Sequence, residues 1–118
     1  MRKRPGPVVK KDTSVRLSRR AVELLDTLTA HYGLSQQGVI ELLVRRCFRT
    51  DCGDLKDPTI QRAVSRAREA SSPMPSKTMG FTPEVLDMMD LLVSEYDLPG
   101  RAEVIESVLL GAALAEGI

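Results

Sequence analysis

The expected fold follows from six residues near the N-terminus, Thr13–Ser18 (TSVRLS). Their apolar side chains, Val15 and Leu17, alternate with polar ones, and a period of two is typical of a strand with one buried face. Ser18 is a good N-cap residue, so a helix is predicted to begin at Arg19 with almost no intervening loop. A strand this short needs a partner strand for its backbone hydrogen-bonding groups.

The same layout recurs 64 residues later, in Ser76–Thr82 (SKTMGFT). Met79 and Phe81 take the apolar positions, and Thr82 takes that of the cap. The apolar stripes of the following helices also align: Val22, Leu25, Leu28 and Tyr32 in the first copy, and Leu86, Met89, Leu92 and Tyr96 in the second. An internal repeat decides the architecture, so we expect two strand–helix–turn–helix units whose strands pair with each other.

The repeat divides the chain into four parts. These are a basic arm (1–11), the first unit (12–50), a connector (51–75) and the second unit (76–118). In the first unit, Gly33 is expected to end the first helix and Ser35 to cap the second. Asp57 followed by Pro58 predicts a short helix in the connector. Three arginines of that helix are expected to be exposed: Arg62, Arg66 and Arg68.

The net charge of +1 conceals a strong asymmetry along the 118 residues. Residues 1–20 contain eight lysines and arginines and one acid, whereas residues 76–118 contain two basic residues and eight acids. Such polarity indicates that the N-terminal end faces a polyanion and that the C-terminal end has a different role.

Few residues of this chain suit catalytic or metal chemistry. Cys47, Cys52 and the single histidine, His31, lack the spacing of a metal site. Cys47 falls on an apolar helix face, where a free thiol is expected, and a disulfide is not expected in a reducing cytosol. Without a nucleophile–base set or a glycine-rich phosphate loop, we expect neither an enzyme nor a cofactor. No apolar run approaches the roughly 20 residues that span a bilayer, which predicts a soluble, cytoplasmic protein.

The run Thr13–Ser18, followed by a helix, the turn Gly33–Ser35 and Val39–Ile40, resembles the ribbon-helix-helix (Arc/MetJ-type) DNA-binding proteins. The resemblance covers residues 12–49 well and residues 76–114 more loosely. It implies a mainly α fold with a short two-stranded antiparallel β-ribbon, formed here by two units of one chain as an intramolecular pseudo-dimer. TraY-like relaxosome accessory factors of conjugative plasmids have such a tandem arrangement. The alternative is that the first unit pairs with the first unit of a second chain.

A β-ribbon fits the major groove of DNA, where only its outward side chains reach base edges. The outward positions predicted to contact bases are Asp12, Ser14, Arg16, Ser76 and Thr78. Arg16 is the expected guanine reader, because its guanidinium can bind two acceptors of that base together. In the second strand, Gly80 replaces the corresponding arginine and Lys77 takes an inward position, so the contact surface is expected to be asymmetric.

Phosphate contacts are predicted at three places. They are Lys10 and Lys11 before the first strand, Ser35, Gln36 and Gln37 at one helix N-terminus, and Gly100 and Arg101 at another. In the ribbon-helix-helix family this helix N-terminus clamps a phosphate, since its free N–H groups and its dipole attract anions. Arg2, Lys3 and Arg4 of the arm are expected to reach phosphates or a minor groove.

Together these patterns predict sequence-specific binding of double-stranded DNA by a transcriptional regulator, most simply a repressor. Within DNA binding, the alternative is a relaxosome or partition accessory protein that binds a plasmid origin. An alternative of another class is an antitoxin-like interaction module whose acidic C-terminal half binds a protein partner. Self-association of neighbouring copies along the DNA is a further expectation left open by the sequence.

Overall fold

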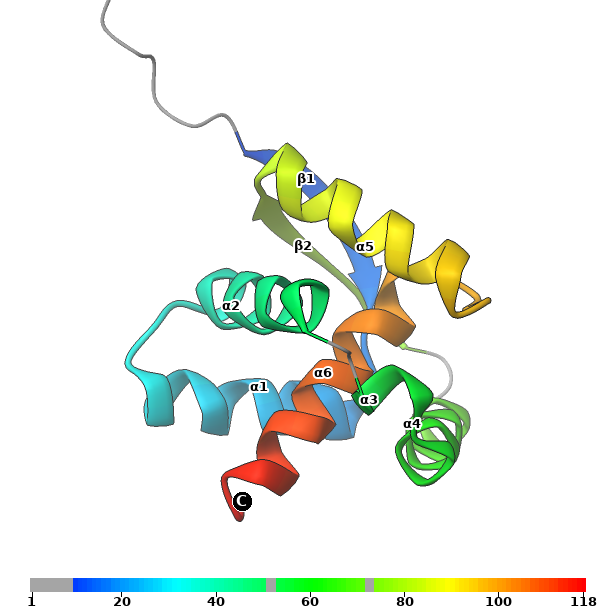
Figure 1. Ribbon diagram of the computed structural model, residues 1–118. Coiled ribbons are helices and arrows are strands. Elements are labelled where there is room, and N and C mark those ends of the chain that lie inside the picture. The colour runs from blue at the N-terminus through cyan, green and yellow to red at the C-terminus, as the bar shows by residue number, and fades with distance from the viewer. Residues whose placement is uncertain (1–9, 51–52, 72–73) are drawn as a thin grey trace, which may run out of the picture.

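The computed structural model describes residues 10–50, 53–71 and 74–118. The chain is mainly helical and has one two-stranded sheet (Figure 1). The elements in chain order are β1 (Lys11–Arg16), α1 (Arg19–Tyr32), α2 (Gln36–Arg49), α3 (Gly53–Lys56), α4 (Pro58–Ala70), β2 (Ser76–Phe81), α5 (Pro83–Glu95) and α6 (Arg101–Ala115). Two strand–helix–helix segments, β1–α1–α2 and β2–α5–α6, are thus joined through α3 and α4. Of these elements, only the one-turn helix α3 was not expected from the sequence.

Both strands lead directly into capped helices. The Ser18 hydroxyl accepts the N–H of Ala21 at 3.1 Å, and the Thr82 hydroxyl accepts that of Val85 at 3.4 Å. Each cap satisfies one of the backbone donors that a helix N-terminus leaves without a partner. Gly33 ends α1 with φ of 67°, a left-handed conformation that strains other residues. The predicted helix boundaries are confirmed at these positions.

β1 and β2 pair antiparallel along their whole length. Ser14 lies opposite Thr78 near the middle of the ribbon, and their side-chain oxygens are 3.3 Å apart. Val15 and Met79 point toward the helices and are buried. The side chains next to them along each strand, such as Ser14 and Thr78, are open to solvent. The alternation predicted for both strands is therefore confirmed.

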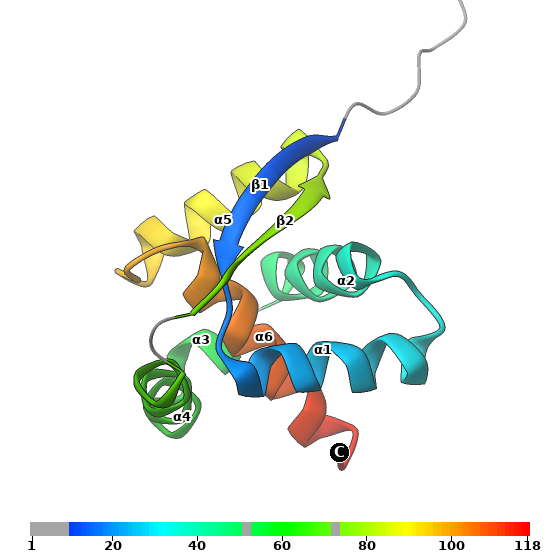
Figure 2. The same ribbon diagram turned by 180° about the vertical axis from the view of Figure 1, so that it is seen from behind.

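One hydrophobic core lies beneath the ribbon and receives side chains from both strands and from α1, α2, α5 and α6. α6 crosses the middle of the molecule (Figure 1 and Figure 2) and is buried around most of its circumference. The stripe of α1 differs in part from the predicted one. Ala21 and Leu24 are buried, whereas Val22 is only half-buried at the edge of the core. Packing against α6 and α4 covers the side of α1 that carries these two residues.

Each strand–helix junction is bonded to a glutamate on a helix of the other segment. Glu106 of α6 accepts the N–H of Ser18 at 3.0 Å and its hydroxyl at 2.6 Å. Glu41 of α2 accepts the N–H of Thr82 at 2.9 Å. Both glutamates follow a Val-Ile pair, and both partners are helix caps, so the two contacts occupy corresponding places in the repeat. Together they hold the two ends of the ribbon on the core.

α4 packs against α1 and α6, and one of its arginines is not exposed as predicted. The Arg68 guanidinium pairs with Glu106 at 2.5 Å and with Glu103 at 3.1 Å. It also donates to the carbonyl oxygen of Arg16 at 2.7 Å. The prediction for Arg68 is wrong because its main partner lies 38 residues further along the chain, beyond the reach of helical periodicity.

Cys47 also differs from its prediction. It is buried on α2 and is disulfide-bonded, whereas a free thiol is expected from the sequence. That expectation rested on the cellular compartment and on the helix face, and neither indicates whether a second sulfur lies within bonding distance. Cys52 lies outside the described residues.

Candidate nucleic-acid interface

One face of the ribbon packs on the core, and the other is open to solvent (Figure 2). The five side chains predicted to contact bases lie on the open face and are all exposed: Asp12, Ser14, Arg16, Ser76 and Thr78. Gly80, opposite Asp12, continues this face without a side chain. The open face therefore presents one cation, one anion and three hydroxyl groups, all of which can exchange hydrogen bonds with base edges.

Arg16 is the last residue of β1, just before the cap of α1. Among the described residues, no carboxylate forms an ion pair with its guanidinium. Its carbonyl oxygen, by contrast, is held by Arg68 of α4. Arg16 thus combines an open side chain with a fixed backbone, which is the arrangement a base-contacting arginine needs.

The lysines near the ribbon occupy different places. Lys10 and Lys11 are exposed at the start of β1, and Lys11 borders a cavity of about 260 Å³ that Arg101 also lines. Lys77 lies opposite Val15, at the inward position that the sequence predicts, and is half-buried. The predicted arm contacts, Arg2, Lys3 and Arg4, lie outside the described residues.

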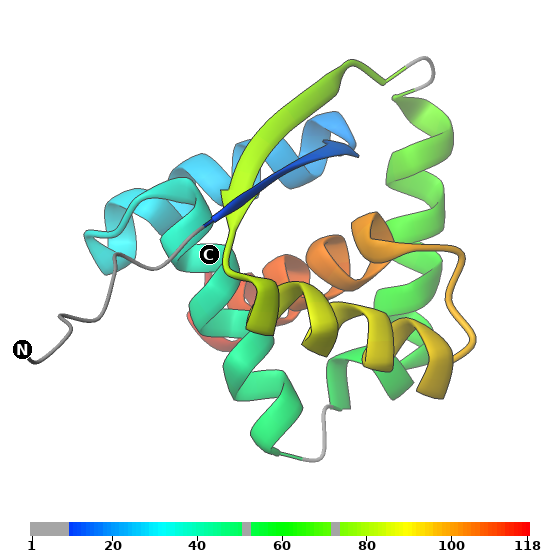
Figure 3. The same cartoon turned by 90° about the horizontal axis from the view of Figure 1, so that it is seen from above.

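The N-termini of α2 and α6, where phosphate contacts are predicted, lie on opposite sides of the ribbon (Figure 1 and Figure 3). At α2, the Ser35 hydroxyl accepts the N–H of Gly38 at 3.1 Å. The Gln36 side chain donates to Asp26 at 3.1 Å, and Gln37 is half-buried. No acid stands in the first turn of α2. The remaining N–H groups of this turn and the positive end of the helix dipole are therefore suited to an anion.

The N-terminus of α6 has a different chemistry. Gly100 provides no capping side chain, and Arg101 forms a two-point ion pair with Asp90 at 2.7 and 2.8 Å. The Arg101 hydrogen bond lowers the pKa of the Asp90 carboxyl, and the same bond raises the pKa of Arg101. Glu103 adds a negative charge to the first turn. A phosphate would have to compete with these carboxylates, so this N-terminus is a poorer anion site than that of α2.

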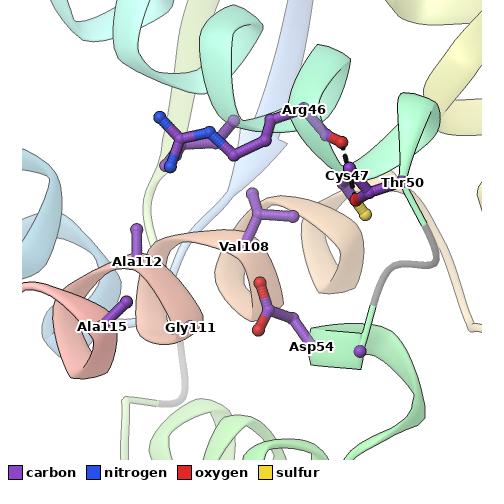
Figure 4. A pocket seen from close by; sticks show the side chains of 10 residues that line it. Arg46, Cys47, Thr50, Asp54, Val108, Gly111, Ala112 and Ala115 are labelled. Carbon is purple, nitrogen blue, oxygen red and sulfur yellow. Dashed lines mark hydrogen bonds between the residues drawn. The ribbon is translucent and has the colours of Figure 1, made fainter.

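A cavity of about 250 Å³ lies between α2, α3 and α6 (Figure 4). Asp54 points toward Gly111 there, and a Cβ on Gly111 would lie only 2.2–2.3 Å from the carboxylate atoms. Burial raises the pKa of the Asp54 carboxyl, and the nearby charge of Asp57 adds to the effect. The described residues contain no group of three possible metal ligands. The cavity explains how α3 docks on α6, and we assign it no chemistry.

A basic surface next to the ribbon was not predicted from the sequence. Four arginines of α1 and α4 are exposed there: Arg19, Arg20, Arg62 and Arg66. A signal was available in the connector, because two of its arginines are four residues apart and so share a helix face. The position at which α4 docks depends on its contacts with other elements, and this is why the surface was missed.

In comparisons of this chain with protein-family models, curated proteins and solved structures, no match was found. Within the described residues, none of the helices has the length and apolar character needed to cross a membrane. The case for a function therefore depends on the shape and charge of the ribbon and its surroundings.

Proposed function

We propose that this chain is a sequence-specific DNA-binding protein of the ribbon-helix-helix type, in which the β1–β2 ribbon enters the major groove. We further propose that it regulates transcription, most simply as a repressor that occludes a promoter. The observation that carries the proposal is the open, polar face of a two-stranded ribbon with Arg16 at one end, where no described carboxylate forms an ion pair with it. The major groove is wide enough for such a ribbon, and the core packing of its other face leaves only the polar face for DNA.

An intramolecular pseudo-dimer is supported by two regularities. The strand register is centred on Ser14 and Thr78, which correspond in the repeat. The contacts of Glu41 and Glu106 with the opposite strand–helix junctions are also reciprocal. A two-unit protein whose units exchange contacts in this way needs no second chain to complete the ribbon.

The side chains of the open face suit a DNA sequence without exact twofold symmetry. Arg16 can bind guanine through two acceptors, and Asp12 can accept from the amino group of cytosine. The three hydroxyls serve either as donors or as acceptors. The position of the second strand that corresponds to Arg16 is Gly80, so the two halves of the ribbon contact different base pairs with different strength.

Phosphate contacts on the two sides of the ribbon are expected to be unequal as well. The first turn of α2 offers free backbone donors around Ser35, whereas Arg101 of α6 is neutralised by Asp90. Lys10 and Lys11 add positive charge at the start of β1. Such contacts position a protein on the duplex, and base contacts provide the sequence preference.

The antitoxin-like alternative is weakened because most acids of the C-terminal half already have partners within this chain. Four of its eight acids form ion pairs with described arginines of this chain, namely Glu84, Asp90, Glu103 and Glu106, and a fifth, Glu116, is hydrogen-bonded to His31. Few carboxylates are therefore left free for a basic protein partner. A plasmid accessory protein would use the same ribbon, so it differs from a regulator only in the DNA site that it marks.

The experiment is selection of preferred duplexes from a random library, followed by binding measurements over a salt series. Arg16→Ala is compared with Arg49→Ala, which removes the same charge from the end of α2 that lies away from the ribbon (Figure 3). We expect Arg16→Ala to lose about 1–3 kcal/mol of preference for the selected duplex over random DNA. Arg49→Ala should keep that preference. Equal preference in the two variants, or no enriched sequence for the wild type, would contradict the proposal.

A further inference from the structure

α1 and α4 meet beside the ribbon and expose arginines on adjoining faces. The four arginines, here called the α1–α4 surface, are Arg19, Arg20, Arg62 and Arg66. No described carboxylate forms an ion pair with any of them. Glu23 and Glu69 are exposed on the same stretch, so four cations face two anions and a positive charge remains.

The arginines belong to one continuous surface, because three shallow cavities connect them. The first is bordered by Ala67 and both arginines of α1. The second, of about 160 Å³, is bordered by Arg20, Ala63 and Ala67. The third is bordered by Ala63 and by two of the three arginines of α4, Arg62 and Arg66. Each cavity shares a residue with the next, so the path from α1 to α4 is continuous, and Glu106 and Leu110 of α6 also line the second cavity.

The α1–α4 surface is fixed in position relative to the ribbon. Figure 2 shows α4 end-on beside the start of α1, just beyond the end of β1. The N–H of Arg19 donates to the Ser71 hydroxyl at 2.9 Å, and Arg68 donates to the carbonyl of Arg16 at 2.7 Å. The pairing of Arg68 with the buried Glu106 anchors the same end of α4. A molecule bound at Arg16 would therefore meet the α1–α4 surface at a defined place.

Among the described residues, the second strand–helix–helix segment carries no equivalent of the α1–α4 surface. The connector helix α4 occurs once in the chain, whereas the strand–helix–helix segment occurs twice. In the repeat, Arg19 and Arg20 correspond to Pro83 and Glu84. Glu84 is in turn paired with Arg45. The positive charge that these four arginines add therefore lies on the side on which α4 docks, whereas the exposed Lys10 and Lys11 lie at the start of β1.

From this placement we infer that the α1–α4 surface binds the DNA backbone on one side of the ribbon only, so that the protein covers its site asymmetrically. The inference rests on the proposed function. Arginine forks bind phosphate oxygens through two parallel hydrogen bonds, and exposed arginines that pair with no described carboxylate, next to the strand proposed to contact bases, are placed for that contact. An acidic segment of a protein partner is the competing occupant, and the absence of an effect on DNA binding would favour it.

The test uses the double variant Arg62→Ala/Arg66→Ala in the full chain, with Arg46→Ala/Arg49→Ala as a control. The control removes the same charge from the last turn of α2. Binding is measured on the selected duplex over a salt series, and on duplexes shortened by one half-turn at either end. Loss of two phosphate contacts should reduce the slope of log K against log salt by about 1.8, and the control should leave it unchanged.

Shortening the duplex at one end should weaken the wild type and leave the Arg62→Ala/Arg66→Ala variant unaffected. Shortening at the other end should affect both proteins equally. The inference is wrong if the Arg62→Ala/Arg66→Ala variant matches the control in the salt slope of log K and in its response to both shortened duplexes. The proposed function stands in that case, provided that the wild type keeps its sequence preference. If the wild type shows no sequence preference and Arg16→Ala changes nothing, both are wrong.

Discussion

Glu106 gives the sharpest prediction for stability, since the chain contains its own matched control. Glu106 is 3% exposed and accepts hydrogen bonds from the Ser18 N–H, the Ser18 hydroxyl and Arg68. Glu41 makes the corresponding contact with Thr82 but is half-buried, and no cation pairs with it among the described residues. Comparing Glu106→Ala with Glu41→Ala therefore separates the effect of the α4 anchor from that of the shared contact.

The magnitudes follow from what each change leaves behind. Glu106→Ala leaves a buried N–H without an acceptor, which costs about 1–3 kcal/mol. It also removes one partner of an ion pair, and breaking buried pairs costs about 3–5 kcal/mol in general. Because Arg68 keeps Glu103 as a second partner, its charge is not left uncompensated, so we expect the ion-pair loss to fall below that range and the two losses together to be about 3 kcal/mol. Glu41→Ala should cost about 1 kcal/mol, the value of one typical hydrogen bond.

Urea unfolding of the two variants, followed by circular dichroism, measures the difference directly. Glu106→Gln provides a further control, because an amide keeps the shape and one acceptor while losing the charge, and its loss should fall between those of the other two. The difference of about 2 kcal/mol between the alanine variants corresponds to roughly 6–10 °C in melting temperature for a domain of this size. Equal losses in Glu106→Ala and Glu41→Ala would refute the idea that the ion pair with Arg68 anchors α4.

The cavity between α2, α3 and α6 yields two more predictions. Gly111→Ala should destabilise the fold and release α3, since the new Cβ would overlap the Asp54 carboxylate. The chemical shifts of α3 residues would report this release. Unchanged shifts would show that the carboxylate moves aside and that α3 stays docked. Asp54→Asn should raise the melting temperature at pH 7. Burial and Asp57 raise the pKa of Asp54 in the folded state, so its ionised form opposes folding above that pKa. Below the unfolded-state pKa the carboxyl is protonated in both states, so the gain should vanish there, and a gain that is independent of pH would contradict this explanation.

Much of the ribbon could be predicted from the sequence because its determinants are local. The alternation around Val15 and Arg16 defines the two faces of β1, and Ser18 marks the start of a helix. The repeat then supplies the partner strand, and the structure adds the register, in which Ser14 lies opposite Thr78. The same reasoning placed the candidate base contacts on one open face, where all five are found.

What the sequence did not predict depends on contacts between distant elements. Arg68 turns inward because Glu103 and Glu106 of α6 lie beside it, and nothing in the connector itself indicates those partners. Arg101 is neutralised by Asp90, a residue on a different helix, so its expected role as a phosphate ligand is weakened by a neighbour. In both cases the residue type and local pattern are those of an exposed arginine, and tertiary packing decides otherwise.

The most direct test of the central claim, that the ribbon contacts bases in the major groove, replaces single guanines of the selected duplex by 7-deazaguanine. This substitution removes the N7 acceptor from the major groove and leaves base pairing intact. At the guanine that Arg16 contacts, we predict a loss of about 1–3 kcal/mol in binding free energy for the wild type and no loss for Arg16→Ala. If no guanine responds in the wild type, or if Arg16→Ala responds equally at every position, then Arg16 does not contact guanine in the major groove and the proposed binding mode is contradicted.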